Sequence, residues 1–128
     1  MGINNINDIG QALSTLTEKI DAYYALTDNT VASAGPVLAE NLLKDKIPSL
    51  SAEEGQVSKG LLMSEGVDYY EHGRQAGEMA IKILKGEDIK NIHAEDNKTS
   101  KKKINGKTAE ALGLDLTNEN LKDAEILK

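Results

Sequence analysis

The fold is decided by residues 23–33, Tyr-Tyr-Ala-Leu-Thr-Asp-Asn-Thr-Val-Ala-Ser. A short apolar run ends in four polar residues, and an apolar-periodic run follows. This pattern predicts a strand over Asp21–Leu26, a polar turn, and a helix over about Thr30–Lys44. In open α/β sheets, ligands bind outside the carboxyl ends of the strands. The turn Thr27–Asn29 is therefore a candidate ligand contact, and the alternative is that Asp28 or Asn29 acts only as a helix N-cap.

The same alternation of strand and helix continues along the chain. Further strands are predicted at Ile47–Ser51, Leu61–Ser64 and Lys101–Ile104, with a weak one at Asn91–Ala94. Further helices are predicted before Asp21 with Asn7 as the cap, for one turn at Gln56–Lys59, over about Asp68–Lys85, and at Lys107–Leu112. Alternating strands and helices predict the α/β class, here a three-layer fold with a mostly parallel sheet and helices on both faces.

Three segments depart from this regular pattern. Pro36 lies early in the helix predicted over Thr30–Lys44 and is expected to bend it, because proline lacks a backbone donor. The basic run Lys101–Lys103 is interpreted as a solvated strand edge. Residues 115–128 are polar and weakly periodic, and we interpret them as a loosely attached tail with one helical turn near Leu121.

Composition excludes several classes of function. The chain has 128 residues, a net charge of −6 and no cysteine. The acidic balance argues against nucleic-acid binding through a basic surface. The lack of cysteine excludes disulfides, thiolate metal sites and thiol catalysis. No apolar stretch reaches the length of a membrane span. We expect no cofactor and no metal site.

The pattern of an enzyme is also missing. His72 and His93 have no partner at the spacing of a catalytic triad or a zinc site, and His72 is expected to face solvent. No glycine-rich loop has nucleotide-binding spacing. Glu53 and Glu54 are adjacent, so their side chains diverge and do not form a glycosidase-type pair. We therefore expect no catalytic residues.

Polar residues follow three of the predicted strands, and in a parallel sheet these turns lie along one edge. Carboxylates there can hold an ammonium or hydroxyls, an asparagine can donate and accept, and a tyrosine can cover an aromatic ligand. The alternative is that these are ordinary surface residues of turns. The candidate ligand-binding residues are Thr27, Asp28, Asn29, Glu53, Glu54, Asp68 and Tyr69.

Four motifs in order resemble one known family. They are Thr-Asp-Asn-Thr-Val-Ala-Ser-Ala at 27–34, Ile-Pro at 47–48, Glu-Glu-Gly at 53–55, and Gly-Val-Asp-Tyr-Tyr-x-x-Gly at 66–73. This order is similar to that of the solute-binding receptors of bacterial ABC transporters, in the branch with the type I periplasmic-binding-protein fold. Some members of that branch are thought to bind aromatic amino acids. The resemblance covers residues 5–114 and matches only the C-terminal half of such a receptor.

The resemblance implies a mechanism and a location. Such receptors grip a small solute, for example an amino acid, in a cleft between two α/β lobes, and the closed form docks on the permease. Residues 5–114 would then form one incomplete lobe, and residues 68–97 would pack on the absent N-terminal lobe. The full-length receptor would be a lipoprotein at the extracellular face of the membrane or in the periplasm. No signal peptide is visible in the sequence, so we expect the signal and the anchor to be absent from this chain.

Two further expectations remain. The effector-binding domain of a transcriptional repressor shares this architecture and is the alternative function. In the chain by itself, the small residues of the long helix would lack their packing partner, and we expect a homodimer through them. Those residues are Gly73, Ala76, Gly77 and Ala80.

Overall fold

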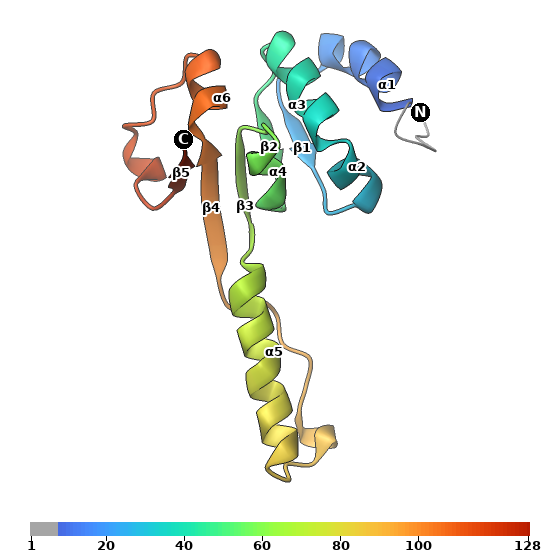
Figure 1. Cartoon of the computed structure of the whole chain (residues 1–128), viewed down its shortest axis with the longest axis vertical. Helices are drawn as coiled ribbons and strands as arrows, with labels where there is room; N and C mark the ends of the chain where they lie inside the picture. The colour runs from blue at the N-terminus through green and yellow to red at the C-terminus, as the bar shows by residue number, and fades with distance from the viewer. Residues whose placement is uncertain (1–7) are drawn as a thin grey trace. The chain divides into compact units, whose positions relative to one another are not determined.

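The structure is a computed structural model that describes residues 8–128. The expected cap Asn7 lies outside the described residues. The chain divides into two compact units. The first unit contains residues up to Gly66 and the segment Lys101–Lys128, and the second contains Val67–Ser100. Figure 1 follows the path of the chain through both units.

The first unit is built on a sheet with the strand order β1-β2-β3-β4-β5. The strands are β1 (Tyr23–Ala25), β2 (Ser49–Ser51), β3 (Met63–Val67), β4 (Ser100–Asn105) and β5 (Glu125–Leu127). The pairs β1–β2, β2–β3 and β4–β5 are parallel. The prediction of an α/β fold with a mostly parallel sheet is confirmed. Parallel neighbours need a crossover connection, and residues 26–48 supply one between β1 and β2.

Two hydrophobic clusters form the core of the first unit. One joins α1 (Asp8–Leu16) and α3 (Gly35–Lys44) to β1, with Ile9, Leu13 and Leu42 almost fully buried. The other joins Leu62 and Ile104 to Ala109 of α6 (Gly106–Ala111). Leu61 belongs to the first cluster and Leu62 to the second, because successive residues of an extended segment point to opposite faces.

The helix predicted over Thr30–Lys44 is two helices. A short helix α2 (Asn29–Ser33) ends at Ala34, and α3 begins at Gly35 with Pro36 in its first turn. Proline is well tolerated there because the first backbone donors of a helix have no intrahelical partner. The expectation of one bent helix is therefore wrong. The proline marks the start of a new helix.

The interpretation of residues 115–128 as a loosely attached tail is also wrong. The 3-10 turn η3 (Glu119–Leu121) matches the expected helical turn near Leu121, but the chain then forms β5. Glu125 pairs with Lys103 in register, and Ile126 with Ile104. Leu116, Leu121 and Ala124 pack against the second cluster. The C-terminal segment thus completes one edge of the sheet.

The second unit contains α5 (Tyr69–Leu84) and the segment that follows it. Gly86 has a φ of 93°, which ends the helix as the sequence predicts. The expected strand at Asn91–Ala94 is wrong, because the chain forms the 3-10 turn η2 (Ile89–Asn91) capped by Asp88. Gln75 is buried and donates to Glu95 Oε2 and to the Asp96 carbonyl, and these bonds tie the returning segment to α5.

Candidate functional site

The candidate site of the first unit lies where β1 and β2 end. Ala25 and Ser51, the last residues of these strands, are paired, and the Ala52 amide donates to the Ala25 carbonyl at 3.0 Å. The polar turns that follow the two strands therefore leave the same edge of the sheet. One turn carries Thr27, Asp28 and Asn29, and the other carries Glu53 and Glu54.

Asp28 is the N-cap of α2. Its Oδ1 accepts hydrogen bonds from the Thr30 amide at 2.8 Å and from the Val31 amide at 3.0 Å. These backbone bonds, with Val31 contributing most, lower the pKa of the Asp28 carboxyl, so the group is an anion at neutral pH. The cap interpretation is correct geometrically. The cap uses only one carboxylate oxygen. It therefore neither supports nor excludes a role of Asp28 in ligand binding.

The neighbours of Asp28 have polar groups available for a ligand. Thr27 and Asn29 are exposed. Within the part of the chain that the structure describes, neither side chain has a hydrogen bond to the protein. A threonine hydroxyl, an asparagine amide and an anionic carboxylate thus lie on one short turn. Together they can donate and accept hydrogen bonds and hold a cationic group.

A lysine that the sequence reasoning missed fixes the helix behind this turn. Lys59, at the end of α4 (Gly55–Ser58), donates from Nζ to the Ala32 carbonyl at 2.6 Å. Ala32 lies in the last turn of α2, where carbonyls lack intrahelical donors and a cation is favourable. The contact spans 27 residues of sequence. No local pattern signals it.

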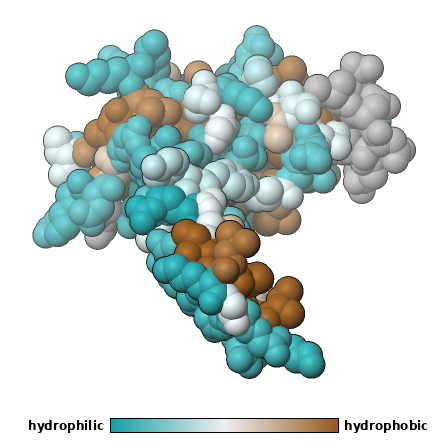
Figure 2. All heavy atoms as spheres, turned by 60° about the horizontal axis from the view of Figure 1, so that its bottom comes forward, coloured by the Kyte–Doolittle hydropathy of each residue, from teal (hydrophilic) through white to brown (hydrophobic). Residues whose placement is uncertain are grey.

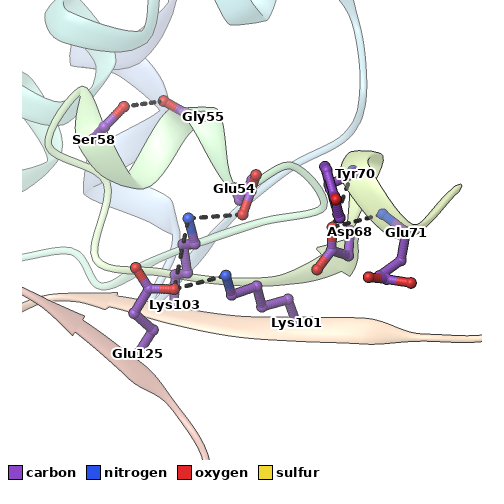
Figure 3. Close-up of polar contacts among 9 residues, drawn as sticks. All are labelled: Glu54, Gly55, Ser58, Asp68, Tyr70, Glu71, Lys101, Lys103 and Glu125. Atoms are coloured by element: carbon purple, nitrogen blue, oxygen red, sulfur yellow. Dashed lines mark hydrogen bonds and ion pairs between the residues drawn. The ribbon is translucent and has the colours of Figure 1, made fainter. Parts of the chain in front are cut away.

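The second turn is held by the protein itself. The Ser51 hydroxyl accepts from the Glu53 amide and donates to the Glu53 carbonyl, both at 3.0 Å. Glu54 Oε2 lies 2.8 Å from Lys103 Nζ, and both side chains are less than one-third exposed. Lys103 also lies 3.8 Å from Glu125, which pairs with Lys101 at 2.8 Å (Figure 3). The expectation that Lys101–Lys103 is only a solvated edge is wrong for Lys103.

Asp68 and Tyr69 belong to the second unit. Asp68 is the N-cap of α5, with Oδ1 accepting from the Tyr70 amide at 3.0 Å and the Glu71 amide at 3.1 Å (Figure 3). Tyr69 is the first residue of the helix, and its side chain is about half exposed, at 51%. Asp28 and Asp68 therefore share one local role: each caps a helix that follows a strand. The sequence signal for both is an acidic residue two or three positions before the helical stripe.

Other features of the described residues limit the function. No helix within residues 8–128 is long and apolar enough to cross a membrane. No group of three or more potential metal ligands comes together in that range. His72 is exposed on α5, as the sequence predicts.

The fold is of the α/β class, with polar turns at the carboxyl ends of β1 and β2. The chain matches the family of ABC transporter substrate binding proteins over residues 1–128, and it belongs to that family. Its members bind solutes and are not enzymes. The match gives no support to a repressor effector domain. The resemblance to ABC-transporter receptors is confirmed.

Two curated relatives cover most of this chain. A tyrosine-binding protein of Clostridioides difficile is 37% identical over 122 residues, which is 94% of this chain and 35% of the relative. An uncharacterised protein of Rickettsia prowazekii, RP367, is 32% identical and is covered to 39%. The chain thus spans little more than a third of the length of these relatives.

Two solved structures share the fold. The ligand-free, open structure of CD0873, a substrate binding protein with adhesive properties from Clostridium difficile, has a TM-score of 0.82 and 34% identity. An ABC domain from Streptococcus pneumonia in complex with L-Trp has a TM-score of 0.80 and 28% identity. This chain is covered to 100% and 98%, and the two solved chains to 43% and 44%. The fold therefore corresponds to part of a substrate-binding protein.

Proposed function

We propose that this chain is part of a receptor that binds an aromatic amino acid and delivers it to an ABC permease. The observation that carries the proposal is the paired ending of β1 and β2, which brings the turns at 27–29 and 53–54 to one edge of the sheet. One relative is named for tyrosine, and one structural neighbour is in complex with L-Trp. Both are aromatic amino acids.

The chemistry of the turn fits such a ligand. An amino acid carries an ammonium group, and the Asp28 carboxylate is an anion that keeps one oxygen outside the cap. Thr27 and Asn29 supply neutral donors and acceptors beside it. In the second unit, taken by itself, Tyr69 is half exposed, which leaves its ring available to an aromatic group. Glu54 is the weakest candidate, since Lys103 already neutralises it.

The proposal extends to the place of action. A receptor that feeds a permease works outside the membrane, so we place the full-length protein at the extracellular face or in the periplasm, held there by a lipid anchor. Residues 68–97 would pack on a second lobe that closes over the ligand. The second unit of this chain, Val67–Ser100, fits that assignment because it forms a compact unit of its own.

The chain by itself is proposed to form a homodimer through α5. Gly73, Ala76, Gly77 and Ala80 are exposed on that helix. The large side chains of Ile81 and Leu84 are 49% and 85% exposed. Figure 2 shows apolar side chains gathered along this unit. Burial of this surface between two copies would remove it from water.

The experiment is a thermal-shift screen of the full-length protein against the natural L-amino acids, followed by calorimetry. Tyrosine, tryptophan and phenylalanine are expected to raise Tm, because a ligand that binds only the folded state stabilises it. D-tyrosine is the matched control for recognition of the ammonium position. A shift from small polar amino acids alone would contradict the proposal.

A further inference from the structure

An apolar cavity lies in the first unit, and none of the turn residues described above lines it. It has a volume of about 230 Å³. Its apolar lining comes from Leu62 and Met63 at β3, Ile104 of β4, and three leucines of the segment that leads from α6 to β5. These leucines are Leu114, Leu116 and Leu121. Asp115 and Asn118 are the polar residues of its lining.

The segment 112–124, here called the strap, is fixed at both ends. The Leu114 amide donates to the Ala109 carbonyl of α6 at 3.0 Å, and Glu125 begins a strand paired with β4. Within the strap, the Leu121 amide donates to the Asn118 carbonyl and the Ala124 amide to the Leu121 carbonyl. A segment anchored in this way cannot settle onto the sheet without breaking these bonds. The backbone on both sides of the cavity is therefore held in place.

The cavity is partly open to solvent, because Leu114 of its lining is 46% exposed. Water gains little in a cavity lined by leucines, whereas a smaller apolar cavity of about 150 Å³ takes up benzene. The ring of a small aromatic molecule therefore fits both the volume and the lining.

Asp115 adds charge at this site. Its Oδ1 accepts from the Thr117 hydroxyl at 2.7 Å and from the Thr117 amide at 2.8 Å. These bonds, the side-chain bond first, lower the pKa of the Asp115 carboxyl and keep it anionic. They also fix its orientation and use one oxygen only. A carboxylate beside an apolar cavity is complementary to a ring that bears an amine.

We propose that this cavity is a second ligand site for a small arylalkylamine, whose ring enters between the strap and the sheet and whose ammonium lies at Asp115. The proposal is independent of the amino-acid site, because its residues lie in the strap and on β3 and β4. It assigns a binding role to the segment that the sequence presents as a polar tail.

The test is a residue-resolved NMR titration of this 128-residue chain with 2-phenylethylamine and with 2-phenylethanol, which lacks the charge. Saturable shifts are expected at Met63, Ile104 and Leu114–Leu121. Asp115→Asn keeps the geometry of the turn and is expected to weaken 2-phenylethylamine about three- to fivefold, the range of an exposed ion pair, with no change for 2-phenylethanol.

Two tryptophan variants locate the site. Leu114→Trp, at a position 46% exposed, is expected to fill the cavity and abolish both titrations. Ile126→Trp, at a position 44% exposed outside the lining, is expected to leave them unchanged. No saturable shift up to about 10 mM, or shifts outside the strap and the two strands, would overturn the proposal. An Asp115→Asn variant that binds both compounds as before would overturn the choice of an amine, even if Leu114→Trp fails to fold.

Discussion

Glu54 and Lys103 form an ion pair of 2.8 Å that connects the turn before α4 to β4. Neither residue is fully exposed, at 29% and 18%, so the pair is less screened than a surface pair. Lys103 is also 3.8 Å from Glu125 of β5. One lysine therefore joins the rim of the candidate site to the strand that closes the sheet.

Lys103→Met is expected to lower the free energy of unfolding by about 1–2 kcal/mol, because two carboxylates lose a partly buried cation. Urea denaturation measures the change. Lys122→Met is the control, since Lys122 and Glu119 are 3.8 Å apart and both well exposed. Equal effects of the two substitutions would show that burial of the pair is irrelevant.

Gly66→Ala is expected to destabilise the chain. A Cβ built on Gly66 would collide with the Ala52 carbonyl oxygen, and backbone cannot move aside as a flexible side chain can. Gly73→Ala is the matched substitution, because nothing lies within 4 Å of a Cβ there. Within a helix, alanine should stabilise by roughly 0.5–1 kcal/mol. Thermal denaturation of both variants should give Tm shifts of opposite sign.

Acid is expected to weaken the attachment of β5. The hydrogen bond from Lys101, then the charge of Lys103, lowers the pKa of Glu125 below its ordinary value of 4.5. A carboxyl whose pKa is lowered by folding contributes stability that is present above pH 4.5 and is lost as pH falls through the lower folded pKa.

In Glu125→Gln, this part of the pH dependence should disappear from urea midpoints measured between about pH 7 and pH 3. Asp123→Asn is the control, because Asp123 has no ion pair among residues 8–128. Identical pH profiles for wild type and Glu125→Gln would show that Glu125 does not contribute to the pH dependence of stability.

Asp28→Ser is expected to separate capping from ligand binding. Serine is a good N-cap, so α2 should remain, whereas the anionic charge is lost. In the full-length protein the affinity for an aromatic amino acid should fall by roughly tenfold or more, as for a lost charged hydrogen bond. Asp88→Ser, at the cap of η2, is the control that should leave affinity unchanged. Unchanged affinity in Asp28→Ser would show that Asp28 acts only as a helix cap.

Self-association of this chain is expected to depend on α5. Light scattering should give a dimer at about 100 μM, and Ala76→Arg should give a monomer, because a charged side chain would enter the apolar contact. Lys90→Arg, on η2, conserves charge and serves as the control. A monomeric wild-type chain at that concentration would refute the dimer.

Local patterns predicted most of the elements but not their ends. The strand β1 and the helix α5 follow from apolar periodicity with capping residues, and both are found within two residues of the expected bounds. Glu125–Leu127 gives almost no strand signal, since three residues are too few for a period and their pairing depends on the open edge of β4. No local pattern predicts the contacts of Lys59 and Lys103 either, because their partners are distant in sequence.

The sequence predicts which turns carry the candidate site, but not which of their side chains are engaged by the rest of the protein. The polar turns after the strands were visible because acidic residues precede the helical stripes at 28 and 68. The engagement of Glu54 by Lys103 was not visible, because it requires the neighbouring strand to be placed first. A sequence pattern can mark which residues leave the end of a strand, but it does not say which of them the protein has already neutralised.

The separation of α2 from α3 has a consequence for how ligand preference can change. No residue of α2 is buried, and its chain joins the core through Ala34, which is fully buried. Apart from Val31, which packs against the first hydrophobic cluster, substitutions in the segment 27–33 therefore cost little packing energy, whereas those from Ala34 onward disturb the interior. A gene copy that keeps the Asp28 cap and Val31 could accumulate changes at the other positions of this short segment and acquire a new ligand with little change in core packing. In this domain, tolerance to substitution belongs to α2 and core packing to the adjacent α3.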